Sequence, residues 1–181
     1  QRYSRHPKPV THTDPIILAS ASPTRAEMLH AVAMTFTVDT AEIDEPQIRD
    51  EMASADPANV AATLAQKKAL AVCARHPNSL VIGADQILNF DGKLLGKPGT
   101  RDGARGQLME LRGHTHQLVT SVCVGQDSEI LWQHTNHANL EMRDFSDGFL
   151  EHYLDQAGPA LNSPGAYHLE SLGASLFATI D

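Results

Sequence analysis

Apolar residues along this chain follow two patterns, and together these predict a succession of strands and helices. Short apolar runs and strict alternation are typical of strands, whereas apolar residues three and four positions apart are typical of helices. The strand pattern covers Ile16–Leu18, Phe36–Val38, Leu80–Asp85, Gln86–Phe90 with Lys93–Leu95, His116–Val124 and Ile130–Met142. The helical pattern covers a segment opening at Pro23, Pro57–His76, Arg101–Leu111 and Ser146–Gln156, and the tail reads as loop plus strand. We therefore expect an α/β or mixed α+β fold.

The helix predicted from Asp56 to His76 has the clearest start, with an N-cap Asp followed by Pro. At about 100° per residue, Val60, Leu64 and Val72 share its inner face. Lys68 falls near the middle of that face. A buried ammonium is unfavourable unless the face borders a polar cleft, although Lys68 can also lie at the edge of the core with its charge in water.

Composition narrows the class of protein. The 181 residues, 41% of them hydrophobic, are enough for one substantial core. The formal net charge of -8 argues against a protein that binds the nucleic-acid backbone through bulk electrostatics. It leaves room for a small anion held by a few cations, with metal ions offsetting nearby carboxylates.

The cysteines, the lengths of the apolar runs and the first residues of the chain indicate where the protein is located and where its domain begins. Cys73 and Cys123 have no metal-type or C-x-x-C spacing, which favours a reduced cytoplasmic setting. No apolar run approaches the roughly 18 residues of a membrane span. We expect a loose leader over residues 1–14, trimmed or incomplete because Met is missing, and a single catalytic domain over residues 15–181.

Three short segments are candidates for phosphate chemistry. In Ser20-Ala21-Ser22-Pro23-Thr24-Arg25 an apolar strand breaks into hydroxyl residues and a helix start, which favours anions. Gly83-Ala84-Asp85-Gln86 ends a buried strand in a carboxylate, and Gly96-Lys97-Pro98 places an ammonium on a stiff loop. Each segment alone is equally an ordinary element: a capped helix, a turn aspartate and a surface turn. His114 and His116 lack a third ligand at a suitable spacing, so a structural role is favoured over a metal site.

Taken together and in order, these segments resemble the Maf family of nucleotide pyrophosphatases from about Ile16 to Ile180. The matching blocks are the opening motif, Ile43-Asp44-Glu45, Leu64 to Ala69, Val81 to Asp85, Gly96-Lys97-Pro98, Gly113 to Thr120 and Gly165-Ala166-Tyr167. Family members usually continue past the last strand with a further helix, so the resemblance implies an incomplete C-terminal end.

The resemblance implies metal-dependent hydrolysis of a nucleoside triphosphate between its alpha and beta phosphates, giving monophosphate and pyrophosphate. It also implies an inosine-triphosphatase-like fold, a long bent mixed sheet with two lobes around a central cleft, and a homodimer. Asp85 matches the catalytic acid, and Glu45 with Asp85 would hold Mg²⁺ or Mn²⁺. Ser20, Ser22, Arg25, Lys68 and Lys97 match substrate-binding positions. This assignment agrees with the chemistry, because phosphoanhydride hydrolysis depends on positioning and charge neutralisation.

The resemblance implies that three positions determine which nucleotide base the protein prefers: Thr24, Gln86 and Glu170. Two of them, Gln86 and Glu170, resemble the branch of the family acting on 7-methyl-GTP, and a carboxylate at Glu170 can accept from guanine N–H groups. Thr24 departs from that branch, which has Trp there, and from the thymidine and uridine triphosphate branch, which has Arg. A dTTP- or UTP-type pyrophosphatase and a non-catalytic nucleotide-binding regulator of cell division are the alternatives.

Overall fold

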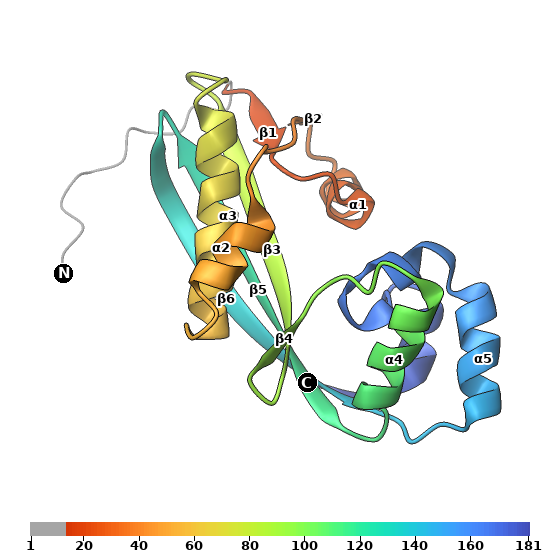
Figure 1. The fold of residues 1–181 in the computed structure, drawn as a ribbon. Coiled ribbons are helices and arrows are strands. Elements are labelled where there is room, and N and C mark those ends of the chain that lie inside the picture. Colours follow the sequence, from red (N-terminus) through yellow and green to blue (C-terminus); the bar gives the residue numbers. More distant parts are fainter. Residues whose placement is uncertain (1–13) are drawn as a thin grey trace. The chain divides into compact units, whose positions relative to one another are not determined.

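The computed structural model describes residues 14–181, so nearly all of the predicted leader lies outside the described residues. The described elements follow the predicted order along the chain (Figure 1). They are β1 (Ile16–Leu18), α1 (Pro23–Ala31), β2 (Thr37–Val38), α2 (Glu45–Glu51), α3 (Pro57–Cys73), β3 (Leu80–Phe90), β4 (Lys93–Leu95), α4 (Arg101–Leu111), β5 (Thr115–Gln126), β6 (Glu129–Met142), α5 (Asp147–Gln156) and β7 (Phe177–Ile180). Three short 3-10 helices, η1 (Gly158–Asn162), η2 (Pro164–Ala166) and η3 (Leu172–Leu176), lie before β7.

The described strands form a seven-stranded mixed sheet. Its order is β2-β1-β3-β5-β6-β7, with β4 paired to β3 outside this path. Strand β1 runs parallel to β2 and β3, whereas β4 and β7 run antiparallel to their neighbours β3 and β6. The predicted mixed α/β class is therefore confirmed.

The chain forms two compact units, each with its own hydrophobic cluster. The first contains the described residues up to Asp85 together with Ser121–Thr135, and the second contains Gln86–Thr120 and Asn136–Asp181. The first cluster joins β1, β3 and β5 to α3 through Ile17, Ala19, Ala65, Ala69, Val72, Cys73, Val81 and Cys123. The second cluster packs α4, α5 and the 3-10 helices around residues such as Leu88, Leu108, Leu140, Leu150 and Tyr153. Because burial of apolar side chains stabilises the elements that carry them, each unit can hold its own elements in place.

Helix α3 begins and packs much as its sequence predicts. Asp56 caps it by accepting a hydrogen bond from the backbone N–H of Ala58. Val60, Leu64 and Val72 have no exposed surface, which confirms the predicted inner face. The helix ends at Cys73 rather than at the predicted His76.

Helix α2 was not expected. The sequence predicts an acidic segment around Ile43-Asp44-Glu45 that Pro46 ends, and no helix. In the structure Pro46 instead lies in the first turn of α2, where the missing proline N–H has no helical partner to lose. Asp44 caps this helix by accepting from the backbone N–H of Gln47 at 3.0 Å. The segment therefore begins a helix, and Glu45 lies on its first turn.

No helix among residues 14–181 is long and apolar enough to cross a lipid bilayer.

Candidate functional site

The first unit gathers polar side chains just beyond the point where β1 and β3 pair. The last register pair of these parallel strands joins Leu18 to Ile82. Ser20 follows β1, whereas Asp85 lies within β3, which continues to Phe90 instead of ending at Asp85 as the sequence predicts; both are buried polar residues. Since carboxyl ends of parallel strands meet at one edge, this is the place where open α/β sheets bind ligands.

Asp85 is the centre of an ion-pair network at this edge. Its Oδ1 lies 2.7 Å from the Nζ of Lys68, and its Oδ2 lies 3.3 Å from an Nη of Arg49. The same Lys68 ammonium lies 3.0 Å from Glu45 Oε1. Asp85 is only 4% exposed and Lys68 9%, so these charges interact in surroundings that water screens weakly. The network explains how an ammonium is tolerated on the inner face of α3.

The opening motif forms a second part of the same edge. Arg25, in the first turn of α1, donates from Nη1 to Ser20 Oγ at 2.9 Å and to the Ala84 carbonyl at 3.0 Å. Ser20 Oγ also accepts from the backbone N–H of Ser22 at 3.2 Å. Ser22 occupies the N-cap position of α1, but its side chain forms no capping hydrogen bond. The first N–H groups of this nine-residue helix therefore have no cap, as an anion-binding helix start requires.

The Arg25 guanidinium is partly desolvated. Burial lowers its pKa, while the carboxylates of Asp85 and Glu45 act in the opposite direction. An arginine remains protonated under such opposing influences because its ordinary pKa is so high. Arg25 therefore adds a permanent positive charge beside Asp85.

The sequence-predicted site residues fall into two groups. Ser20, Ser22, Thr24, Arg25, Glu45, Lys68 and Asp85 belong to the first unit. Gln86, Lys97 and Glu170 belong to the second unit and are all exposed. Gln86 donates to Thr120 Oγ1 at 2.9 Å, on the strand face opposite to Asp85. The ion pairs and hydrogen bonds of the first unit thus bring together Ser20, Arg25, Glu45, Lys68 and Asp85.

Comparison with known proteins identifies the family. Residues 15–181 match the family model described as Maf-like protein. The chain belongs to the Maf family. It is 49% identical over 168 residues to a protein of Paramagnetospirillum magneticum named nucleoside triphosphate pyrophosphatase, covering 91% of this chain and 87% of that one. It is 38% identical over 169 residues to a protein of Brucella abortus named 7-methyl-GTP pyrophosphatase, covering 92% and 85% of the two chains.

A solved structure of a HAM1 protein from Coxiella burnetii matches 73% of this chain and 74% of that one, with 14% identity and a TM-score of 0.48.

Arg49 is the site residue of this Maf protein that the sequence reading missed. It lies on α2 four residues after Glu45, so both side chains emerge from one face of the helix. The signal was available in principle: Glu45 and Arg49 have the spacing of a helical pair. Pro46 hides this pair, because proline ends helices as well as beginning them.

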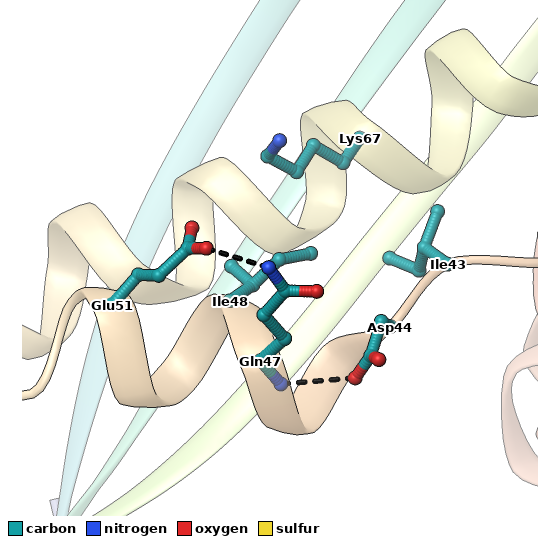
Figure 2. Close-up of a pocket in the computed structure, with 6 residues that line it drawn as sticks. All are labelled: Ile43, Asp44, Gln47, Ile48, Glu51 and Lys67. Atoms are coloured by element: carbon teal, nitrogen blue, oxygen red, sulfur yellow. Dashed lines mark hydrogen bonds between the residues drawn. The ribbon is translucent and has the colours of Figure 1, made fainter.

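The hollow shown in Figure 2 lies beside this network and does not contain it. Its lining residues are Ile43, Asp44, Gln47, Ile48, Glu51 and Lys67. Gln47 donates to Glu51 at 2.8 Å within it. None of the predicted site residues lines the hollow, because α2 turns a different face toward Asp85 from the one it turns toward Lys67.

His116 has a structural setting in the second unit. Its Nε2 lies 2.7 Å from the Tyr167 hydroxyl, and its Nδ1 is buried without a hydrogen-bond partner among the described residues. Burial lowers the pKa of His116 to about 4. The imidazole is therefore neutral at pH 7. The rings of Tyr167 and Phe177 lie beside it, with centroids 5.7 and 5.8 Å from its own.

Proposed function

We propose that this Maf protein is a cytoplasmic, metal-dependent nucleoside triphosphate pyrophosphatase that acts as a homodimer. It hydrolyses the bond between the alpha and beta phosphates and releases nucleoside monophosphate and pyrophosphate. The observation that carries the proposal is the buried Asp85 carboxylate with Lys68, Arg49 and Arg25 around it at the edge of the parallel strands. The names of the most similar relatives support the same reaction.

In this reaction Asp85 accepts the proton of the attacking water. The water oxygen forms the new bond to phosphorus as the bond to the bridging oxygen breaks, and pyrophosphate leaves. Such a transfer requires little covalent chemistry from the protein, and cations placed around the phosphates supply most of the stabilisation. We assign that task to Arg25 and Lys68, with Lys97 as a further cation from the second unit. Ser20, Ser22 and the first N–H groups of α1 bind phosphate oxygens.

A divalent metal suits the donor set of the site. Glu45 and Asp85 both reach the Lys68 ammonium, so their oxygens converge on a position that favours positive charge. Among the described residues no three His, Cys, Asp or Glu side chains form a metal-binding group. Two carboxylates with phosphate oxygens and water are the usual ligands of Mg²⁺, and Mn²⁺ accepts the same ligands. When bound, the metal would neutralise charge on the phosphates.

As the substrate we favour 7-methyl-GTP or another modified nucleotide. Gln86 and Glu170 support this preference, and relatives named 7-methyl-GTP pyrophosphatase are among the similar proteins. A carboxylate at Glu170 can accept from guanine N–H groups and offset the positive charge of a methylated ring. Thr24 supplies no aromatic face for that ring, so a dTTP- or UTP-type preference is the alternative.

The decisive experiment measures the products and uses Asp85→Asn. The wild-type protein should release pyrophosphate from a nucleoside triphosphate only with Mg²⁺ or Mn²⁺ present. Asp85→Asn should lower kcat roughly 10²- to 10⁴-fold, because the amide cannot accept the proton of water. Circular dichroism should show an intact fold, since Lys68 keeps Glu45 as a partner.

Two outcomes would contradict the proposal. Release of orthophosphate alone would place the cleavage at a different bond. Tight calorimetric binding of a triphosphate with no product, whatever the metal, would instead favour a nucleotide-binding regulator.

A further inference from the structure

Arg49 is a third cation at Asp85 that the resemblance to the family did not assign. Its Nη2 lies 3.3 Å from Asp85 Oδ2, while Lys68 takes the other oxygen at 2.7 Å. Both oxygens of the buried carboxylate therefore have a cationic partner. Each cation lowers the basicity of the carboxylate, so Asp85 accepts a proton from water more readily once one of the two partners has left.

The contacts indicate that Arg49 is the one that leaves. Lys68 joins two carboxylates through its ammonium and is 11% exposed at its side chain. Arg25 is held by Ser20 and the Ala84 carbonyl. Arg49 has one hydrogen bond among the described residues, at the long end of the usual range, and its side chain is 27% exposed. Of the three cations it is held by the fewest contacts.

The charge of the network points the same way. Arg25, Arg49 and Lys68 are three cations against the two carboxylates Glu45 and Asp85, so the network carries an excess positive charge in a chain of net charge -8. A guanidinium has five N–H donors in a fork that matches phosphate geometry. With one donor engaged, the remaining donors of Arg49 can bind phosphate.

We propose that Arg49 binds the phosphate chain of the substrate and in doing so releases Asp85 Oδ2 to accept the proton of water. This inference rests on the proposed function. Phosphate carries more charge than one carboxylate and accepts bidentate hydrogen bonds from arginine. Binding of the triphosphate is thereby coupled to the exposure of the general base.

The test compares Arg49→Gln and Arg49→Lys with Lys67→Gln. Lys67 is an exposed cation on α3 next to Lys68, it lines the hollow of Figure 2, and its removal changes the net charge equally. Calorimetry with pyrophosphate in Mg²⁺ buffer should show affinity weakened roughly 10- to 100-fold in Arg49→Gln, the range of a charge-assisted hydrogen bond. Arg49→Lys should fall in between, because it keeps the charge but loses the fork. Lys67→Gln should bind as the wild type does.

Kinetics separate phosphate binding from a purely structural ion pair. In Arg49→Gln the KM should rise by a similar factor while kcat changes little, since Oδ2 is already released. Pyrophosphate affinity and KM equal to those of Lys67→Gln, with only a lower melting temperature, would overturn the inference and leave the pyrophosphatase proposal intact. A wild-type protein that hydrolyses no triphosphate but binds pyrophosphate through Arg49 would contradict the proposed function and retain Arg49 as a phosphate ligand.

Discussion

At the scale of single residues, the burial of Lys68 and Asp85 depends on their mutual charge. Each is under 10% exposed, and their charged atoms lie 2.7 Å apart. Burying either ion alone is costly, and a paired geometry offsets that cost. Such a pair fixes the position of the buried carboxylate more than it adds to stability.

Replacing Lys68 by Met should show this dependence. The variant leaves Asp85 buried with Arg49 as its remaining cationic partner, so the free energy of unfolding should fall by about 3 kcal/mol. Adding Asp85→Asn should recover part of that loss, because no uncompensated charge stays buried. Urea unfolding of both single variants and the double variant measures the coupling. Strictly additive effects would show that the pair is not coupled.

Glu170 is the residue that we propose recognises the nucleotide base. It is exposed in the turn before η3, where a carboxylate is available to a ligand. Glu170→Gln should lower the preference for 7-methyl-GTP over dTTP, UTP and CTP by about tenfold, the effect of losing one charge-assisted hydrogen bond. Initial rates on the four nucleotides measure it, with Glu110→Gln as a control elsewhere in the second unit. An unchanged substrate ranking would remove Glu170 from base recognition.

At the scale of elements, the site depends on how closely α3 approaches β3. A Cβ at Gly83 would lie 2.3 Å from the Ala65 carbonyl oxygen and 2.8 Å from the Ala69 Cβ. Real side chains do not tolerate such distances, so glycine on the strand and alanines on the helix permit this approach. The same turn of the helix carries Lys68, between Ala65 and Ala69, and the strand carries Asp85 two residues after Gly83. Close packing therefore sets the Lys68–Asp85 distance.

Gly83→Ala should consequently lower the stability of the protein and disturb the contact between Lys68 and Asp85. The forced separation of α3 from β3 should cost about 3 kcal/mol of unfolding free energy and weaken triphosphate binding. Gly106→Ala is the matched control: nothing lies within 4 Å of its added Cβ, and alanine favours the interior of α4. Thermal melts should show a lower midpoint for the first variant and an equal or higher midpoint for the second. Equal melting of Gly83→Ala and the wild type would contradict the close approach.

At the scale of the whole molecule, stability depends on two cores that differ in their sensitivity to pH. The core of the first unit contains the Cys73 and Cys123 thiols, and burial raises the pKa of Cys123 to about 11. The core of the second unit packs against His116, whose pKa burial lowers to about 4 from 6.5. Of these three groups only the histidine can gain a charge as the pH falls from 7 to 4, so part of the effect of acid on the second unit should come from this residue.

Unfolding free energy should fall by about 3 kcal/mol as the pH falls from 6.5 to 4, on account of His116. In that window the unfolded chain binds a proton at the imidazole and the folded chain does not, so acid favours unfolding. His116→Gln should remove this part of the pH dependence while the Tyr167 hydroxyl keeps a polar neighbour. Urea midpoints at pH 7, 5.5 and 4.5 measure it. Parallel curves for the two proteins would contradict a buried neutral imidazole.

The sequence by itself determined the elements, their order and most of the chemistry placed on them. Periodicity and caps are local properties, so α3, α4 and the β5–β6 hairpin lie close to their predicted positions. The buried position of Lys68 followed from the same helical spacing. The sequence also carried the resemblance that the family match confirmed.

The tertiary structure alone decided which charges meet. Arg49 and Asp85 are 36 residues apart in the chain. No local sequence pattern predicts that α2 brings Arg49 close to Asp85. The start of α2 at Glu45, with Pro46 in its first turn, is equally undetermined by the sequence, because proline both ends and begins helices, and here the buried Ile48 holds the helix in place. Long-range contacts between separate elements place two cations, Lys68 and Arg49, at the buried Asp85 carboxylate in the middle of β3.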